Sequence, residues 1–155
     1  MRIDLLRHGD AVREALDGDA RRALSEEGVR SIRALAAQLR GLGPPPARAF
    51  SSPYLRARQT AELVLAGWGT ADATALELLT ELEPDADPVH AMRTVSGMAQ
   101  DATHVLVVAH QPLLGRILVR LTGVERGLAP GTLARIEWSP GAGGGASLER
   151  VLPPE

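Results

Sequence analysis

Cysteine is absent from this 155-residue chain, and lysine is absent as well. Without cysteine the chain can form no disulfide, no thiolate nucleophile and no cysteine-ligated zinc site. The formal net charge is only -2, which gives no basis for nucleic-acid binding by bulk attraction. All 17 basic residues are arginine. A GC-rich genome is a sufficient cause of that bias, and phosphate recognition would be a functional one.

Long apolar runs are also missing, because none approaches the ~20 residues that a membrane-spanning helix needs. The charges of Arg2 and Asp4 interrupt any signal peptide at the amino end. We therefore expect a cytoplasmic protein that binds neither membrane nor nucleic acid. A length of 155 residues with 45% hydrophobic residues predicts a single domain over 1–155 with its own core. The oligomeric state is left open.

Short apolar runs rich in β-branched residues predict strands at 2–7, 48–51, 75–78, 104–109, 132–138 and 146–152. Helical periodicity fills most of the intervals, with helices beginning after Ser25 and at Ser52-Pro53, Asp87-Pro88 and Gln111-Pro112. The alternation predicts an α/β sandwich with a largely parallel sheet. The glycine-rich segment 139–145 is too short for a helical crossover, so the last two strands should form an antiparallel hairpin. Residues 10–22 and 67–74 are predicted loops.

The strand predicted at 2–7 ends in Arg7, and His8 and Gly9 follow directly. A neutral imidazole is a good nucleophile toward phosphorus, and a guanidinium binds phosphate oxygens through a planar fork. Burying a cation at a strand end without an anion is costly. We therefore interpret His8 as a candidate nucleophile and Arg7 as a phosphate ligand. The alternative for His8 is a buried histidine satisfied by backbone groups.

Arg56 is predicted to lie near the first turn of a helix, where the helix dipole disfavours a cation. Arg58 has Glu62 four residues on, an ordinary surface pair, whereas Arg56 has no acid within reach on its own helix. A bound anion would explain Arg56 in this position. The alternative is a solvated surface arginine.

His110 follows the strand predicted at 104–109 and precedes a predicted helix. His8 also follows a strand, and ligands of open α/β sheets bind at the carboxyl ends of the strands. If the two strands are adjacent and parallel, both imidazoles reach one crevice. His110 could then donate a hydrogen bond to a phosphate oxygen. A helix-capping or buried polar role is the alternative.

Two histidines with acids nearby are also compatible with a metal site, but the charges argue against one. Arg7 and Arg56 would repel a divalent cation in the same pocket, and neither H-x-x-x-H nor H-E-x-x-H spacing occurs. We therefore expect no bound metal. His90 and His104 are interpreted as surface residues without a role, one near a helix start and one at a strand start.

Three blocks of the chain resemble, in the same order, the histidine phosphatase (phosphoglycerate mutase-like) superfamily. They are Arg7-His8-Gly9, Ser52-Pro53-x-x-Arg56-Ala57-x-Gln59-Thr60 and Val107-Val108-Ala109-His110. The short length and three further stretches are most similar to the SixA-type phosphohistidine phosphatases: Arg7-His8-Gly9-Asp10-Ala11, Arg22-x-Leu24-Ser25-x-x-Gly28 and His110-Gln111-Pro112. The resemblance implies a three-layer α/β/α sandwich and a phosphohistidine intermediate on His8. It also implies that Arg7, Arg56 and His110 hold phosphoryl oxygens, and that neither metal nor diffusible cofactor is needed.

The same resemblance suggests an acid after the third strand, and Glu81 is the best match, with a solvated loop glutamate as the alternative. An alkoxide leaving group needs a proton from such an acid, whereas a phosphoramidate can be protonated on nitrogen beforehand. A site without a good acid therefore suits phosphohistidine. The chain also has little spare sequence between its motifs to enclose a small substrate, which favours a phosphorylated protein. We expect a phosphatase that removes phosphate from phosphohistidine on a protein. The alternatives are a phosphomonoesterase for small phosphorylated metabolites and a non-catalytic phosphoprotein-binding module, which the presence of His8 disfavours.

Overall fold

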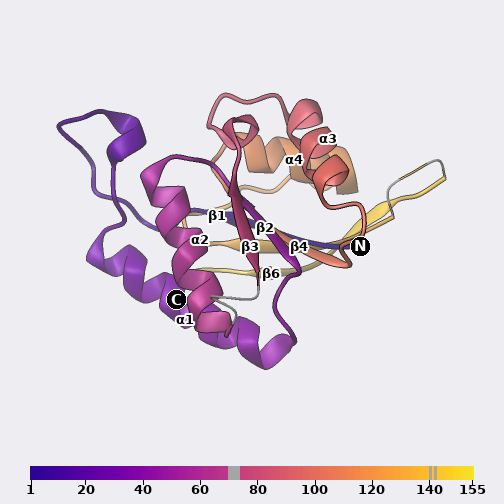
Figure 1. Ribbon diagram of the computed structural model, residues 1–155, viewed down its shortest axis with the longest axis horizontal. Coiled ribbons are helices and arrows are strands. Elements are labelled where there is room, and N and C mark those ends of the chain that lie inside the picture. Colours follow the sequence, from indigo (N-terminus) through magenta and orange to yellow (C-terminus); the bar gives the residue numbers. More distant parts are fainter. Residues whose placement is uncertain (70–73, 140, 142) are drawn as a thin grey trace.

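A computed structural model describes residues 1–69, 74–139, 141 and 143–155, and in this part of the chain six strands form one sheet (Figure 1). They are β1 (Arg2–Arg7), β2 (Arg48–Ser51), β3 (Ala75–Leu78), β4 (His104–Ala109), β5 (Leu133–Trp138) and β6 (Ala146–Leu152). The strand order is β3-β2-β4-β1-β5-β6. The first four strands in this order pair in parallel, and β5 and β6 are antiparallel. The predicted strands and the carboxyl-terminal hairpin are confirmed.

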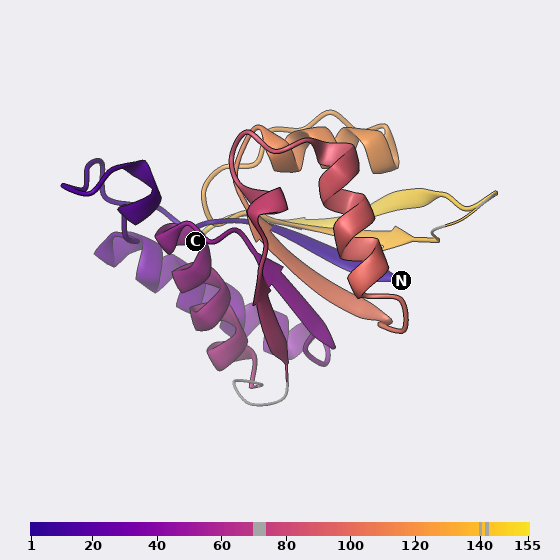
Figure 2. The same ribbon diagram turned by 45° about the horizontal axis from the view of Figure 1, so that its top comes forward.

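Helices cover both faces of this sheet. On one face lie α1 (Glu26–Leu42) and α2 (Leu55–Trp68), and on the other lie α3 (Pro88–Met98) and α4 (Leu113–Thr122) (Figure 2). Each pair packs on its own apolar cluster, one containing Ile32 and Leu106, the other Ile117 and Val107. Every residue of β4 is buried because this central strand is covered on both sides. The three-layer α/β/α sandwich is thereby confirmed.

The predicted loops differ in detail from the structure. Residues 67 and 68 belong to α2, and the segment 10–22 contains a short 3-10 helix, η1 (Asp19–Arg21). Residues 70–73, 140 and 142 of the predicted loops lie outside the described residues. No helix in the described ranges combines the length and apolar character that crossing a bilayer requires.

Capping side chains begin two of the helices as predicted. Ser25 caps α1 by accepting from Gly28 N, and Asp87 caps α3 by accepting from His90 N. The predicted start of α2 is too early, since this helix begins only at Leu55, whereas α4 begins at Leu113, directly after the predicted Gln111-Pro112. The reason at α2 is a local turn in which Ser52 Oγ accepts from Tyr54 N at 3.2 Å.

His104 is buried, so its interpretation as a surface residue was wrong. It begins the central strand β4, its ring lies 5.6 Å from that of Trp68, and its Nε2 lies 2.8 Å from Asp4 Oδ2. Arg135 donates two further hydrogen bonds to the same carboxylate, each at 2.8 Å. Burial alone would raise the pKa of Asp4, but the hydrogen bonds from Arg135 and His104 outweigh it and lower that pKa. His90 is exposed, as predicted.

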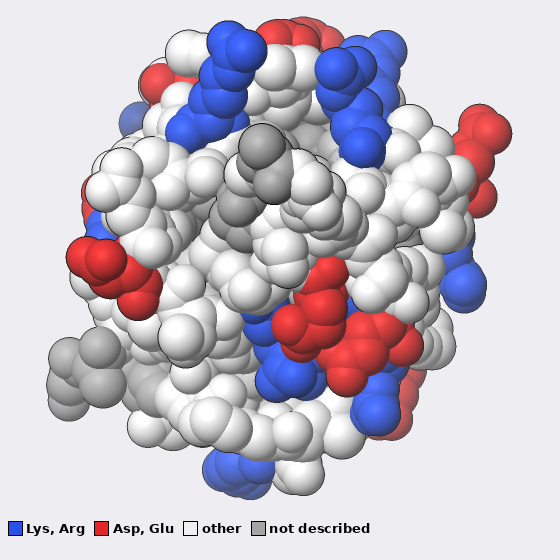
Figure 3. Space-filling model, turned by 90° about the vertical axis from the view of Figure 1, so that its right-hand side faces the viewer, with Lys and Arg blue, Asp and Glu red and all other residues white. Residues whose placement is uncertain are grey.

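Charges of both signs occur on the face at the amino ends of the parallel strands. Figure 3 shows acidic and basic side chains side by side there. Arg2 at the start of β1 pairs with Glu137 at 2.8 Å, and Arg48 at the start of β2 pairs with Glu77. The chemistry-bearing residues of the sequence lie at the opposite edge, where these strands end.

Candidate active site

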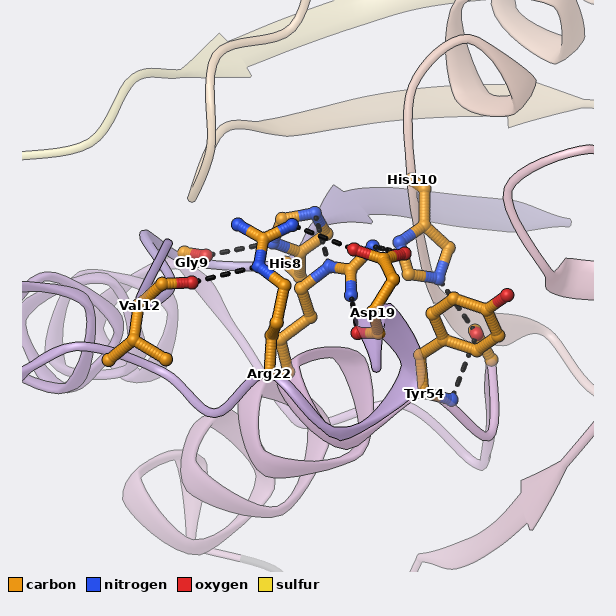
Figure 4. A network of polar contacts seen from close by, with 9 residues as sticks. His8, Gly9, Val12, Asp19, Arg22, Tyr54 and His110 are labelled. Atoms are coloured by element: carbon orange, nitrogen blue, oxygen red, sulfur yellow. Dashed lines mark hydrogen bonds and ion pairs between the residues drawn. The ribbon is translucent and has the colours of Figure 1, made fainter. Parts of the chain in front are cut away.

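Two neighbouring strands bring His8 and His110 together. In the parallel pair of β1 and β4, the last residues, Arg7 and Ala109, are in register. Each histidine directly follows the last residue of its strand. His8 N donates to Ala109 O at 3.1 Å, and the two imidazole ring centroids are 5.1 Å apart (Figure 4). The predicted convergence at the carboxyl edge of the sheet is therefore confirmed.

The hydrogen bonds of His8 determine which of its nitrogens is free to react. Its Nδ1 lies 2.8 Å from Gly9 O, and because a carbonyl only accepts, Nδ1 carries the proton. Its Nε2 keeps a lone pair and accepts from Arg56 Nε at 3.3 Å. Burial, opposed by the bond to Gly9 and reinforced by Arg56, lowers the pKa of His8 to about 4. At neutral pH the imidazole is therefore uncharged and nucleophilic at Nε2.

Arg56 lies in the first turn of α2 and is only 5% exposed, so it is not a solvated surface arginine. Its NH1 donates to Asp19 O at 2.8 Å, and its NH2 donates to Asp19 Oδ2 at 3.2 Å. Sequence reasoning missed Asp19, which comes from the segment 10–22. The only available signal was its spacing of three residues from Arg22, to which it is paired at 2.9 Å. The predicted surface pair of Arg58 and Glu62 is present at 3.5 Å.

His110 is held by Ser52 at the turn before α2. His110 Nε2 lies 2.8 Å from Ser52 Oγ, and the ring of Tyr54 stands at 5.2 Å from that of His110. The other ring nitrogen, Nδ1, is buried and has no hydrogen-bond partner among the described residues. Burial, with His8 and Arg56 acting in the same direction, lowers the pKa of His110 to about 3. Ser52 is the first residue of the motif block that contains Arg56, but its hydrogen bond with His110 was not predicted.

Arg7 adds a second guanidinium to this edge. Its NH1 donates to Leu128 O at 2.8 Å, while its Nε is buried without a partner in the described part of the chain. Burial and the nearby charge of Arg56 both lower the pKa of Arg7. Two guanidinium groups of like charge therefore lie near one another at this edge. Such a pair is costly to bury unless an anion joins it. The described ranges contain no group of three or more His, Cys, Asp or Glu side chains that could hold a metal ion. Two guanidinium groups at one sheet edge fit an oxyanion, because they bind phosphate oxygens through N–H donors.

Small and polar residues of the motifs connect these groups. Gly9 N donates to Thr60 Oγ1 at 3.0 Å, and Thr60 Oγ1 donates to Arg56 O at 2.7 Å. The loop of the nucleophile is thus tied to the helix of the arginine. A Cβ on Gly28 would lie 2.1 Å from Asp10 O, so only glycine allows the loop to approach α1 so closely.

Glu81 stands apart from this group. It lies in the 3-10 helix η2 (Thr80–Leu82), which follows β3, and β2 separates β3 from the strand of His110. Its side chain accepts from Thr80 Oγ1 at 3.4 Å. Among the described residues, no hydrogen bond or ion pair joins Glu81 to the histidines or to Arg56. The structure therefore brings together four of the five predicted site residues and leaves Glu81 at the same sheet edge, without a hydrogen bond or ion pair to the other four among the described residues.

The two buried histidines predict how stability depends on pH. Their folded-state pKa values of about 4 and about 3 lie below the ordinary value of 6.5, so the unfolded chain binds protons first. Stability should then fall as the pH drops from about 6.5, with each histidine contributing a slope of up to about 1.4 kcal/mol per pH unit. Urea unfolding between pH 7 and pH 5 measures the slope. In His8→Gln it should be shallower, and an unchanged slope would contradict the assignment of a neutral buried imidazole.

Comparison with known proteins agrees with this geometry. A model of the histidine phosphatase superfamily (branch 1) matches residues 3–86. Phosphohistidine phosphatase SixA of Escherichia coli (strain K12) is 33% identical over 126 residues, which are 78% of this chain and 74% of that protein. The solved structure of the protein histidine phosphatase SixA complexed with tungstate matches with a TM-score of 0.89 at 26% identity, covering 99% and 97% of the two chains. Alpha-ribazole phosphatase from Shigella flexneri shares the fold, with a TM-score of 0.74 at 19% identity over 96% and 95%.

The chain therefore belongs to the histidine phosphatase superfamily. Its enzyme class is that of a phosphatase, and the likeness carried by the three motif blocks is confirmed.

Proposed function

We propose that this protein removes phosphate from phosphohistidine on a protein, without a metal, through a phosphohistidine intermediate on His8. One observation carries the proposal: His8 Nε2 is unprotonated and accepts from Nε of the buried Arg56 guanidinium at 3.3 Å, at the sheet edge that also holds His110. Phosphoryl transfer needs a nucleophile, here the His8 imidazole, with fixed positive charge from arginine and a neutral hydrogen-bond donor such as His110 beside it.

In the first step, His8 Nε2 attacks phosphorus in line with the bond to the substrate nitrogen, which breaks. Charge on the equatorial oxygens is stabilised by Arg7 and Arg56 through their N–H groups, and by His110 if its unpartnered Nδ1 carries the proton. The proton stays on His8 Nδ1, whose N–H donates to Gly9 O, while the phosphorylated ring becomes cationic. In the second step, water attacks the phosphorus, the bond to Nε2 breaks, and inorganic phosphate leaves.

Two further observations support phosphohistidine as the substrate. The relative that is 33% identical is phosphohistidine phosphatase SixA. In addition, Glu81, the predicted proton donor, has no hydrogen bond or ion pair with the histidines among the described residues. A substrate whose leaving ring already carries a proton on its other nitrogen leaves as neutral imidazole and needs no such donor.

A comparison of substrates tests the function. The protein, treated with EDTA, should release phosphate from a phosphohistidine peptide with a higher kcat/KM than from p-nitrophenyl phosphate or sugar phosphates. Rapid acid-free quenching with labelled substrate should trap a phosphoenzyme that acid destroys. Faster turnover of sugar phosphates would support a phosphomonoesterase instead, and binding without turnover would support a phosphoprotein-binding module.

Glu81→Gln tests whether this carboxyl group donates a proton. Because no hydrogen bond or ion pair joins Glu81 to the histidines or to Arg56 in the described residues, kcat/KM for the phosphohistidine peptide should change by less than about twofold, within the range of ordinary surface changes. A phosphomonoester with an alkoxide leaving group should be affected more, by about 10² if Glu81 is the acid for esters. Steady-state kinetics on both substrates decide the matter. A large and equal loss on both would reject the distinction.

A further inference from the structure

An acid occupies the edge of the pocket that the mechanism assigns to an oxyanion. Asp19 opens η1 directly after Gly18, whose φ of 97° turns the chain toward the site. Its Oδ1 accepts from Arg22 NH1 at 2.9 Å and its Oδ2 accepts from Arg56 NH2 at 3.2 Å. In Figure 4 its carboxylate lies between His8 and His110. The hydrogen bond from Arg22 and the charge of Arg56 lower the pKa of Asp19, so the group is ionised at neutral pH.

This carboxylate would oppose an ordinary phosphate monoester, whose oxygens are all negative or neutral. It does not exclude a phosphoryl group, however. A guanidinium has five N–H donors, and Arg56 directs three of them to His8 and Asp19, which leaves two for phosphoryl oxygens. The Asp19 side chain is 56% exposed, so a group arriving from solvent can reach it. Asp19 therefore stands where it can contact the part of the substrate that projects out of the pocket.

In phosphohistidine, the part of the substrate that projects out of the pocket is an imidazole ring, which an ionised carboxylate binds when the ring is protonated. When one ring nitrogen bears the phosphoryl group and the other bears a proton, the ring is a cation with an N–H donor. On P–N cleavage the bonding electron pair stays on the ring nitrogen, and the ring leaves as neutral imidazole with its proton in place. Without that proton it would have to leave as an imidazolide anion.

We propose that Asp19 binds the protonated imidazole ring of phosphohistidine and thereby selects this substrate over phosphate esters. The proposal rests on the proposed function and assigns its substrate preference to one side chain. The leaving ring and the attacking ring then match, since the Nδ1–H of His8 is held by Gly9 O and the outer N–H of the substrate is held by Asp19. Phosphoryl transfer between them is close to symmetrical, with positive charge lost by one ring and gained by the other.

Asp19→Asn removes the charge and keeps the shape. We expect its kcat/KM to fall about tenfold to a hundredfold on a phosphohistidine peptide, the range for losing one charge-assisted hydrogen bond. On p-nitrophenyl phosphate, whose leaving group needs no cationic partner, kcat/KM should rise because a repulsion is removed. Asp19→Glu, which retains the charge, should recover part of the preference. The matched control is Asp17→Asn, an exposed acid of the same segment, which should behave as the wild type.

Opposite effects on the two substrates are the signature that a merely structural role would not produce. An equal loss on both would mean that Asp19 only holds Arg56, and an equal gain would mean that it only obstructs the pocket; either result overturns the inference. A wild-type protein that turns over p-nitrophenyl phosphate but leaves the phosphohistidine peptide intact would remove the proposed function and this inference with it. A wild type active on both, with unchanged selectivity in Asp19→Asn, would remove the inference alone.

Discussion

Replacement of His8 by alanine is expected to abolish the phosphoenzyme and to lower kcat/KM by at least about 10⁴-fold. The reason is that Nε2 of His8 is the group aimed at phosphorus, while Arg7, Arg56 and His110 only bind and polarise the phosphoryl group. What remains in the variant is a pocket that holds an oxyanion without attacking it. Labelled phosphohistidine peptide, quenched without acid and separated from the protein, measures the covalent species directly.

Two control measurements distinguish loss of the nucleophile in His8→Ala from misfolding of the variant. The exposed His90 offers a matched substitution, and His90→Ala should retain wild-type label and turnover. The His8→Ala protein should still bind vanadate or tungstate, because the two guanidinium groups are unchanged. If His8→Ala keeps the covalent label, His8 is not the nucleophile.

Replacement of Arg56 by alanine should lower kcat/KM by about 10²–10³, the usual cost of removing one preorganised donor to transition-state charge. Arg56 is buried and its Nε contacts the nucleophile, so the loss should fall on the chemical step as well as on binding. The acid limb of the pH profile should also move to higher pH, because Arg56 is one of the charges that depress the pKa of His8. Steady-state kinetics from pH 4 to pH 8 measure both effects.

The chain supplies its own control two residues away. Arg58 lies on the same helix, pairs with Glu62 at 3.5 Å and is far more exposed, so Arg58→Ala should leave kcat/KM within about twofold. Arg56→Lys keeps the charge but not the planar fork and should recover only part of the activity. Equal losses in Arg56→Ala and Arg58→Ala would show that helix stability, and not phosphate binding, had been measured. Urea unfolding of both variants separates these explanations.

Much of the architecture followed from local patterns. Apolar runs identified the strands because a strand covered on both faces, such as β4, has to be apolar throughout. Ser25 and Asp87 identified helix starts because a capping oxygen serves N–H groups only two or three residues away. The start of α2 was placed too early, since proline is compatible with the turn before a helix as well as with its first residue.

Local patterns also explain which site residues could be identified from the sequence. His8, Arg7, Arg56 and His110 were identified because each sits at a strand end or helix start that the pattern itself located. Asp19 and Ser52 were missed as partners of Arg56 and His110, because their contacts join segments 37 and 58 residues apart along the chain. The spacing of Asp19 from Arg22 indicates a local ion pair and gives no indication of the contact with Arg56.

The sequence by itself determined the order of strands and helices, the parallel sense of the main sheet and the four groups offered to a phosphoryl substrate, since each depends on residues close together along the chain. Only the tertiary structure decided that His104 and Arg135 pair with the Asp4 carboxylate, that His110 is hydrogen-bonded to Ser52, and that Asp19 accepts from Arg56. The physical reason is that burial and charge depend on what packs nearby in space. Proximity of that kind arises only when distant segments meet.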